Sequence, residues 1–248
     1  MTTGFVLSGG GARGISHLGV VKALAGQGIV PEVLSGTSAG AIIGAFLAAG
    51  YDPDEILQII RKTSLLKAFL PAFSRQGLLK MTRLEKLLKD MLPAEFASLQ
   101  KPLTVAATDI YKGELVYLAD GPLVPAVLAS ACVPVIFKPI RLNGRQLVDG
   151  GLLNNLPAEA LHGKVERLIA ISCNPGGPVS RLPNARALME RSALLAINGN
   201  VAPSKQLCDV FIEPPELVHY SGFGLSQAQA IFKVGYDYTR ENLHKFAL

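Results

Sequence analysis

The sequence predicts an α/β fold: a three-layer sandwich in which a mainly parallel central sheet is covered by helices on both faces. Short apolar segments typical of buried strands alternate with longer segments typical of helices, which implies parallel strands joined by helical crossovers. The 248 residues are 49% hydrophobic, enough to form one sizeable core. We therefore expect one domain over residues 1–248.

The N-terminal third of the chain is predicted to contain two strands and four helices. The first elements are the strand Gly4–Ser8, a helix after Gly14, the strand Val33–Ser35 and a helix over Ala39–Ala49. The third helix begins with a capping box, in which Asp52 is the N-cap, Pro53 takes the first helical position and Glu55 closes the box. Thr82–Glu85 repeats this pattern, so Thr82 is the expected N-cap of the fourth helix.

The remaining elements alternate in the same way. Asn143-Gly144 is the strongest short hairpin signal, with Leu147-Val148 returning into Asp149. The other expected elements are the strands Leu103–Ala107, Leu115–Leu118, Leu168–Ser172 and Val210–Ile212, and a closing helix over Gln227–His244.

The cysteines exclude several classes of protein. Cys132, Cys173 and Cys208 are widely spaced and form no CxxC pair. Neither a metal site nor a disulfide framework is therefore expected, and no cofactor is implied. We expect small, buried thiols in a reducing compartment.

The N-terminus does not match a signal peptide, because it lacks a basic region and its apolar stretch is too short. The longest nearly apolar run, Ala39–Ala49, is well below the roughly 20 residues of a membrane span. The sequence therefore predicts a cytoplasmic protein.

The formal net charge of +5 arises from one segment. Between residues 61 and 89, one acidic residue, Glu85, accompanies eight basic ones: Arg61, Lys62, Lys67, Arg75, Lys80, Arg83, Lys86 and Lys89. The interleaved residues are Leu, Phe and Ala rather than a platform of stacking aromatics, which disfavours nucleic acid as a partner. An anionic lipid surface fits better, and a solvated helix face is an equal alternative.

Ser64–Gly77 lies within this basic segment. Large apolar residues stand among its basic ones, namely Leu65, Leu66, Phe69, Leu70 and Phe73. Pro71 prevents a continuous helix. We expect this stretch to be a mobile flap that contacts anionic lipid, giving a peripheral association with the inner face of the membrane.

Two glycine-rich loops, Gly9–Gly14 and Gly36–Gly40, follow the first two predicted strands. Because the carboxyl ends of parallel strands meet at one edge of a sheet, both loops open on the same edge. Ligands bind at such an edge, so an interpretation of the function must use both loops.

The second loop, Gly36-Thr37-Ser38-Ala39-Gly40, matches the Gly-x-Ser-x-Gly nucleophile elbow. A serine on a tight strand-to-helix turn takes a strained backbone conformation, and Gly36 and Gly40 remove the Cβ atoms that would clash. Ser38 then stands at the start of a helix, whose dipole favours developing negative charge. Ser38 is therefore a candidate nucleophile.

The first loop has the Gly9-x-Gly11-x-x-Gly14 spacing of a dinucleotide-binding turn. That interpretation requires an acid at the end of the second strand, but Glu32 precedes Val33–Ser35 and GTSAG stands at the strand's end. A P-loop is disfavoured because no Gly-Lys-Ser/Thr sequence follows the glycines.

An oxyanion hole explains the first loop better. Acyl transfer needs backbone N–H groups that point at a developing oxyanion, with no side chains in the way. The amides of Gly9, Gly10 and Gly11 meet this need, and Arg13 could add positive charge or orient the loop.

A serine nucleophile also needs a base. None of the four histidines, His17, His162, His219 and His244, lies in a motif of its own. Asp149 does, because "LVDGG" places it at the end of a hairpin strand with Gly150 and Gly151 beside it. On these residues alone, a turn-forming Asp-Gly-Gly is an equal interpretation.

Taken together, these motifs resemble those of bacterial patatin-like phospholipases. The matching segments are Gly9–Gly14, Gly36–Gly40 and Asp149–Gly151 followed by "LLNNLP", with Ala106–Asp109 and Ala129–Pro139 between them. The similarity runs from the first strand to about Pro157, with a weaker echo in "CDVFIEP" and the last helix. Three motifs in order at compatible spacing are far more specific than any one of them.

The resemblance implies a patatin-like fold and a lipid acyl hydrolase that uses a Ser–Asp dyad without histidine. In this dyad Ser38 is the nucleophile, Asp149 is the general base, and the amides of Gly9–Gly11 form the oxyanion hole. The implied substrate is a lipid ester, either phospholipid or lysophospholipid. An ordinary carboxylate, with a pKa of about 4, is a weak base toward a hydroxyl, so Asp149 is expected to be buried, which raises its pKa.

Three other interpretations stay open on the sequence. An acyltransferase to a thiol carrier shares the elbow serine, but it usually brings a histidine and an arginine for which no motif is found. A Ser-His-Asp α/β-hydrolase would need His219 or His244, and its elbow would come unusually early in the chain. A non-catalytic lipid-binding regulator is disfavoured by the intact Ser38 and Asp149.

Overall fold

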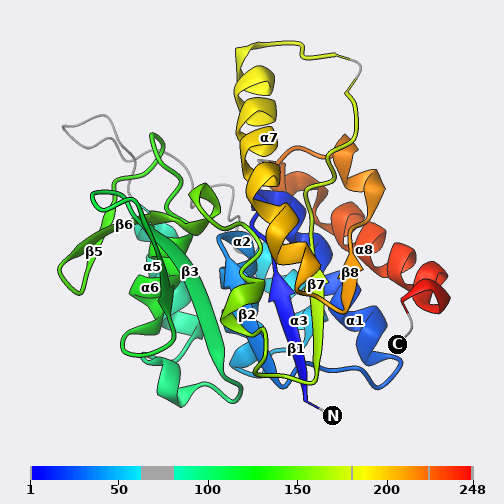
Figure 1. Ribbon diagram of the computed structural model, residues 1–248, viewed down its shortest axis with the longest axis horizontal. Helices are drawn as coiled ribbons and strands as arrows, with labels where there is room; N and C mark the ends of the chain where they lie inside the picture. The colour runs from blue at the N-terminus through cyan, green and yellow to red at the C-terminus, as the bar shows by residue number, and fades with distance from the viewer. Residues whose placement is uncertain (1, 63–80, 180, 223, 247–248) are drawn as a thin grey trace.

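The computed structural model describes residues 2–62, 81–179, 181–222 and 224–246. The strands of these residues form one eight-stranded sheet in the order β5-β6-β3-β2-β1-β7-β8, with β4 also paired to β3 (Figure 1). Their bounds are β1 (Thr3–Leu7), β2 (Val33–Thr37), β3 (Leu103–Asp109), β4 (Glu114–Leu118), β5 (Ile140–Leu142), β6 (Arg145–Asp149), β7 (Arg167–Ile171) and β8 (Val210–Ile212).

The centre of the sheet is parallel, and one edge is antiparallel. β1 pairs in parallel with β2 and β7, β2 with β3, and β7 with β8. The pairs β3–β4, β3–β6 and β5–β6 are antiparallel. All five residues of β1 are buried, which explains its continuous apolar run. The prediction of a mainly parallel sheet is confirmed, and the antiparallel edge makes the whole sheet a mixed one.

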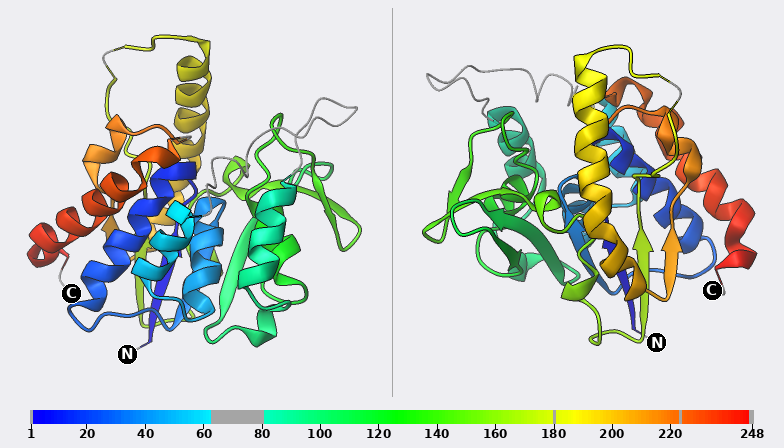
Figure 2. Two further views of the ribbon diagram at one scale, coloured as in Figure 1. Left: turned by 180° about the vertical axis from the view of Figure 1, so that it is seen from behind. Right: turned by 45° about the horizontal axis from the view of Figure 1, so that its top comes forward.

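Helices cover both faces of this sheet. Figure 1 shows α7 in front of the sheet, and the view from behind in Figure 2 (left) shows α1, α2, α3 and α8 on the opposite face. Their bounds, with those of two further helices, are α1 (Ser16–Ala25), α2 (Ala39–Ala48), α3 (Pro53–Lys62), α5 (Thr82–Met91), α6 (Leu123–Ser130), α7 (Ala185–Gln206) and α8 (Ala228–Asn242). The three-layer arrangement is therefore confirmed.

The local signals at helix starts and turns have mixed outcomes. The capping box of α3 is confirmed, because Glu55 Oε2 accepts from the Asp52 N–H at 2.9 Å. Asn143 and Gly144 form the predicted hairpin turn between β5 and β6, with φ of 50° and 74°. Thr82 as an N-cap is wrong: the Glu85 N–H donates to Met81 O at 2.8 Å, so Met81 is the N-cap and Thr82 is the first helical residue.

The 22-residue helix α7 is not predicted by the sequence pattern. Leu194 and Val201 are buried, but Leu188, Met189 and Leu195 are more than half exposed. Apolar residues therefore stand on several sides of the helix, and no apolar stripe marks it in the sequence. Among the described residues, no helix has both the length and the apolar character needed to cross a membrane.

The register of β3 brings distant parts of the chain together. Ala106 pairs with Thr37, the last residue of β2. The next residue of β3, Ala107, pairs with Asp149, the last residue of β6. Ser38, which follows Thr37, and Asp149 therefore lie at neighbouring points of the sheet although 111 positions separate them in the sequence.

Candidate active site

Ser38 occupies the sharp turn between β2 and α2. Its backbone has φ 53° and ψ −118°, a conformation that is strained for any residue except glycine. A Cβ atom on Gly36 would lie 2.5 Å from the Gly40 carbonyl oxygen, and one on Gly40 would lie 2.2 Å from the Leu7 carbonyl oxygen. Neither glycine can be replaced without moving the backbone, so both shape the turn that presents Ser38.

The Ser38 hydroxyl is hydrogen-bonded directly to Asp149. Ser38 Oγ donates to Asp149 Oδ2 at 2.7 Å, and the Gly151 N–H donates to Asp149 Oδ1 at 2.8 Å. Burial raises the pKa of Asp149 to about 6, although both hydrogen bonds act to lower it. The carboxyl group is thus a stronger base than an ordinary aspartate, as the sequence argument expects.

Ser130 holds the backbone of the turn. The Ser38 N–H donates to Ser130 Oγ at 2.8 Å, and Ser130 is fully buried at the end of α6. Sequence reasoning did not identify this residue. Its only signal was its place in the segment Ala129–Pro139, which resembles the phospholipase family.

In the described structure, two amides of the glycine loop lack an acceptor, not three. The Gly9 N–H donates to the Asn155 carbonyl oxygen at 3.1 Å, and the Ala12 N–H donates to Gly222 O at 2.6 Å. The Gly9 amide is therefore occupied and does not have the oxyanion role that the sequence suggests. In the described part of the chain, no acceptor is found for the amides of Gly10 and Gly11.

A cluster of buried donors fixes the peptide group that carries the Gly10 amide. The Gly9 carbonyl oxygen accepts from Asn174 Nδ2 at 2.5 Å, Asn155 Nδ2 at 3.4 Å and Cys173 Sγ at 3.3 Å. Burial raises the pKa of the Cys173 thiol to about 11, so the thiol keeps its proton. Because a trans peptide directs its C=O and N–H to opposite sides, these donors turn the Gly10 N–H away from themselves.

Arg13 and His17 lie beside the same loop. Arg13 is only 6% exposed, its Nε has no partner among the described residues, and its charge lowers the pKa of Cys173 against the larger effect of burial. His17 Nε2 donates to Ser8 O at 2.8 Å, and burial lowers the pKa of His17 to about 4. His17 is therefore neutral, and its hydrogen bond holds the residue that directly precedes the glycine loop.

The remaining predicted glycines lie where the backbone is crowded. A Cβ atom on Gly14 would lie 2.7 Å from Ala39 Cβ, and one on Gly150 would lie 2.3 Å from Ala106 O. Gly151 supplies the amide that donates to Asp149. These three glycines let the glycine loop, the elbow and the aspartate approach one another.

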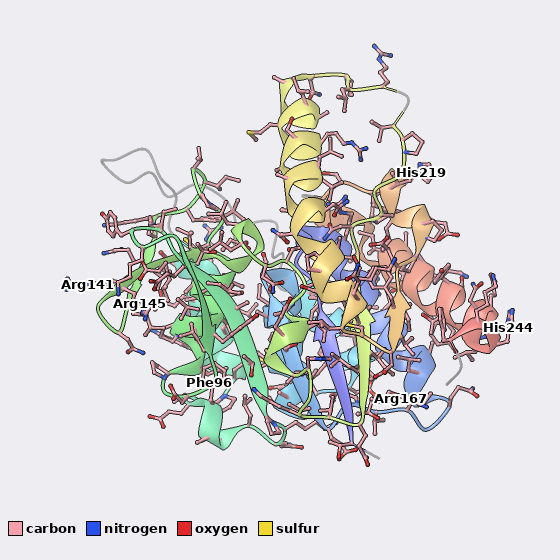
Figure 3. All side chains as sticks on the ribbon, viewed as in Figure 1. Phe96, Arg141, Arg145, Arg167, His219 and His244 are labelled. Carbon is pink, nitrogen blue, oxygen red and sulfur yellow. The ribbon has the colours of Figure 1, made fainter. Side chains whose placement is uncertain are left out.

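The other three histidines lie away from Ser38. His162 is exposed, with Nδ1 3.3 Å from Leu207 O. Figure 3 shows His219 and His244 on the side of α8, away from the junction of β2 and α2. In the part of the chain that the structure describes, no histidine is hydrogen-bonded to Ser38 or Asp149. The described residues therefore show no Ser-His-Asp arrangement.

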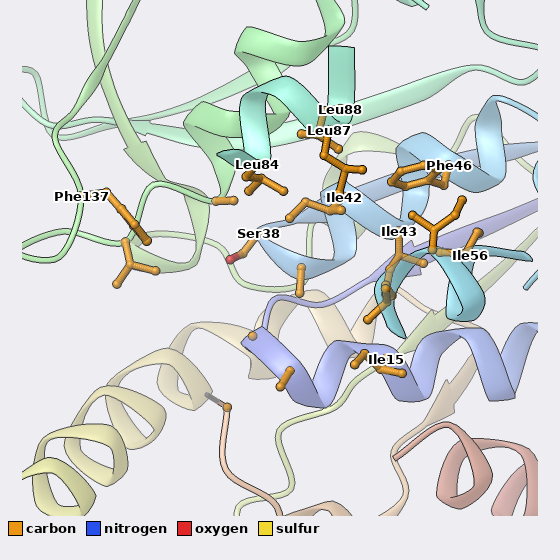
Figure 4. Close-up of a pocket in the computed structure, with 18 of the residues that line it drawn as sticks. Ile15, Ser38, Ile42, Ile43, Phe46, Ile56, Leu84, Leu87, Leu88 and Phe137 are labelled. Carbon is orange, nitrogen blue, oxygen red and sulfur yellow. The ribbon is translucent and has the colours of Figure 1, made fainter. Parts of the chain in front are cut away.

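An apolar cavity of about 230 Å³ lies next to Ser38 (Figure 4). Its walls come from α2, α3, α5 and the segment 131–137, together with Gly11, Ala12, Ile15 and Gly222. Ser38 is the only polar side chain among the described residues that line it. This cavity can hold a hydrocarbon chain beside the hydroxyl group, and the backbone of Gly11 lines it at the same end as Ser38.

Residues 5–162 match the family model of patatin-like phospholipases, and the chain belongs to this family. An uncharacterized NTE family protein of Mycobacterium tuberculosis is 34% identical over 173 residues, which cover 68% of this chain and 48% of that protein. The protein YqhO of Bacillus subtilis is 35% identical over 186 residues, 61% of this chain and 64% of YqhO. The chain thus spans about half the length of this mycobacterial relative.

Solved structures share the fold at low sequence identity. VipD from Legionella pneumophila has a TM-score of 0.53 at 20% identity, covering 99% of this chain and 67% of VipD. The type III effector ExoU of Pseudomonas aeruginosa has a TM-score of 0.54 at 17% identity, covering 100% of this chain and 53% of ExoU. Human GIVD cytosolic phospholipase A2, in complex with methyl gamma-linolenyl fluorophosphonate, has a TM-score of 0.50 at 13% identity, covering 99% of this chain and 58% of that protein.

Proposed function

We propose that the chain is a serine acyl hydrolase that cleaves carboxylic ester bonds of lipids, either phospholipid or lysophospholipid. The observation that carries this proposal is the 2.7 Å hydrogen bond from Ser38 Oγ to Asp149 Oδ2, formed at the wall of an apolar cavity. Membership of the patatin-like phospholipase family supports the same assignment.

In the proposed first step, Ser38 Oγ attacks the carbonyl carbon of the ester while Asp149 accepts the hydroxyl proton. The electron pair of the carbonyl moves to its oxygen, and the free amides of Gly10 and Gly11 stabilise this oxyanion. The tetrahedral intermediate then collapses. The bond to the leaving alcohol breaks, Asp149 returns the proton to that oxygen, and the acyl group stays on Ser38.

In the proposed second step, a water molecule attacks the acyl carbon and Asp149 accepts its proton. Collapse releases the fatty acid, and the proton returns to Ser38 Oγ. One carboxyl group serves both half-reactions, as base and then as acid, so its pKa of about 6 suits it better to both roles than the ordinary value of 3.8.

Labelling by a serine-directed probe tests the nucleophile. The chain is incubated with a lipid-like fluorophosphonate, such as the compound bound to human GIVD cytosolic phospholipase A2, and the labelled peptide is identified by mass spectrometry. We expect one label on Ser38, none on Ser38→Ala, and full labelling of Ser192→Ala, which changes an exposed serine on α7. Label on another residue, or ester hydrolysis by Ser38→Ala, contradicts the proposal.

Lipid analysis then defines the reaction. A panel of phospholipids and lysophospholipids is incubated with wild type and Ser38→Ala, and the released fatty acids are measured. An acyl-enzyme that persists in water and is discharged by an added thiol would instead favour the acyltransferase alternative.

We also propose contact with an anionic membrane surface. Ser64–Gly77, the segment predicted to make this contact, lies outside the described residues. Exposed basic residues on α3 and α5 support the proposal: Arg61, Lys62, Arg83, Lys86 and Lys89. Lys62→Glu with Lys86→Glu should weaken binding to phosphatidylglycerol vesicles and leave hydrolysis of a soluble acetate ester unchanged. Unaltered vesicle binding would mean that these residues form a solvated helix face.

A further inference from the structure

We infer that the apolar cavity selects the length of the acyl group and that Phe46 sets the limit at about eight to ten carbons. This inference rests on the proposed function, because it concerns the acyl chain attached to Ser38. It makes medium-chain acyl esters the preferred substrate class.

The cavity runs along α2. Ser38, Ile42 and Phe46 are spaced four residues apart, so they lie on one face of the helix and follow its axis. Figure 4 shows Ser38 at one end of this face and Phe46 with Ile56 at the other. The eight steps along the helix from Ser38 to Phe46 rise about 12 Å at about 1.5 Å per residue. An extended chain advances about 1.2 Å per bond, so this length holds about ten bonds.

The volume of the cavity gives an independent estimate. An apolar protein cavity of about 150 Å³ binds benzene, which has six carbons. At the same ratio, the cavity beside Ser38, with about 230 Å³, holds about nine carbons. Length and volume thus agree on a medium-length chain.

The far wall of the cavity is braced on two sides. Phe46 is only 3% exposed, and its ring packs edge-on against Tyr51, with 5.3 Å between the ring centroids. The Tyr51 hydroxyl donates to Met91 O, the last residue of α5, at 2.8 Å. Ile56 of α3, 1% exposed, completes the wall. A longer chain therefore cannot push Phe46 aside without also moving Tyr51 away from α5.

This geometry predicts the dependence of the rate on chain length. Each methylene that enters the cavity should raise kcat/KM about fourfold, because it leaves water for an apolar wall. A methylene beyond Phe46 finds no further room and adds nothing, or lowers the rate. The profile should therefore rise to about eight to ten carbons and then level off or fall.

A series of p-nitrophenyl esters from acetate to palmitate, each below its aggregation limit, tests the inference. Wild type is compared with Phe46→Ala, which opens the far end, and Ile56→Phe, which fills it. Phe96→Ala is the matched control, because Phe96 is a buried phenylalanine (6% exposed) that does not line the cavity. Thermal unfolding establishes that each variant is folded.

We expect Phe46→Ala to move the optimum at least two carbons upward and to raise the rate ratio of the twelve-carbon to the eight-carbon ester at least about tenfold. Ile56→Phe should move the optimum downward, and Phe96→Ala should leave it in place. The acetate ester does not reach the far wall, so its rate should stay within about threefold of wild type in all variants, a margin for indirect packing loss.

Two results overturn the inference while leaving the proposed function intact. One is a wild-type preference for the palmitate ester over the octanoate ester. The other is an unchanged profile in a folded Phe46→Ala variant. Failure to hydrolyse any ester, acetate included, together with no labelling of Ser38 by the fluorophosphonate, overturns the proposed function and this inference with it.

Discussion

On one side of Ser38 the described residues form a dense hydrogen-bond network, and on the other side they form an apolar wall. The polar side contains Asp149, Ser130 and the donors to the Gly9 carbonyl oxygen. The apolar side contains side chains of α2, α3 and α5. Directional contacts fix atoms to within tenths of an ångström, whereas an apolar wall fixes only the available room. Under the proposed function, the polar side sets the reaction rate and the apolar side sets the choice of substrate.

The largest expected effect comes from removing the proposed general base, Asp149, on the polar side. Asp149→Asn keeps the size of the side chain and removes the proton acceptor, so kcat should fall about 10²–10⁴-fold. Thermal stability should not fall, because burial disfavours the ionised carboxylate that the variant removes. Steady-state kinetics and thermal unfolding at pH 7 measure both quantities. Near-wild-type turnover would assign the role of base to another residue.

The pH dependence of the wild type tests the same role of Asp149. The pKa of Asp149 is raised from 3.8 to about 6 in the native state, so the native protein takes up this proton more readily than the unfolded chain. The contribution of Asp149 to stability is therefore present below about pH 4 and is lost as the pH rises through about 6. Activity has the opposite sign, because the base must be ionised: kcat/KM of wild type should fall about tenfold per unit below pH 6. An activity midpoint near pH 4 would contradict the raised pKa.

The second prediction concerns Asn174, a residue of the polar side that is not part of the dyad. Asn174→Ala removes the shortest hydrogen bond to the Gly9 carbonyl oxygen and lets the Gly10 amide turn. Direct loss of an oxyanion donor costs about 100- to 1,000-fold in kcat, so this indirect change should cost about 10- to 100-fold, with KM within about twofold. Gly10→Ala is a poorer probe, because its methyl group would lie 2.3 Å from Cys173 Sγ.

Asn198→Ala is the matched control for Asn174→Ala. Asn198 Nδ2 donates to the Asn174 carbonyl oxygen at 3.1 Å, and it is not among the described donors to the Gly9 carbonyl oxygen. Its loss should leave kcat within about threefold, a margin for indirect effects. Equal losses in the two variants, or a loss in KM alone, would mean that Asn174 acts only through packing.

The sequence predicts one part of this polar side well and another part poorly. Ser38 and Asp149 each lie in a short local motif, because their crowded turns need glycines nearby: Gly36 and Gly40 around Ser38, and Gly150 and Gly151 after Asp149. Asn174 and Ser130 have no such motif. Their partners, Gly9 and Ser38, lie 165 and 92 positions away in the sequence, so only the folded sheet shows the contact.

The same contrast holds for the fold. The strands are predictable because burial on both faces leaves continuous apolar runs, as in β1 and β7. Helix α7 is not predictable, because its exposed and buried sides are both apolar. The occupied amide of Gly9 could not be predicted either, since its acceptor, Asn155, lies far along the chain.

The third prediction concerns the histidines, none of which contacts the dyad in the described structure. Single changes of His162, His219 and His244 to Gln should leave kcat unchanged within about twofold. His17→Gln keeps a donor near Ser8 O and should leave kcat within about tenfold, a margin of roughly 1.4 kcal/mol for packing loss. A folded histidine variant as inactive as Ser38→Ala would replace the dyad with a triad.

The smallest expected effect concerns backbone strain, which occurs both at Ser38 and in the segment beside the apolar cavity. Ser38 has φ 53°, a strained conformation that the elbow requires. Val135 has φ 70° and is 86% exposed, beside cavity-lining residues of the segment 131–137.

A β-branched residue such as Val135 in this backbone region costs about 1–2 kcal/mol. Val135→Gly relieves that cost but makes the unfolded chain more flexible by about 0.5–1 kcal/mol. We therefore expect a net stabilisation of about 0.5–1 kcal/mol, seen as a higher urea midpoint at unchanged slope. Hydrolysis of the acetate ester should not change, since Val135 is not hydrogen-bonded to the dyad. A less stable Val135→Gly would show that the valine side chain packs well enough to outweigh its backbone strain.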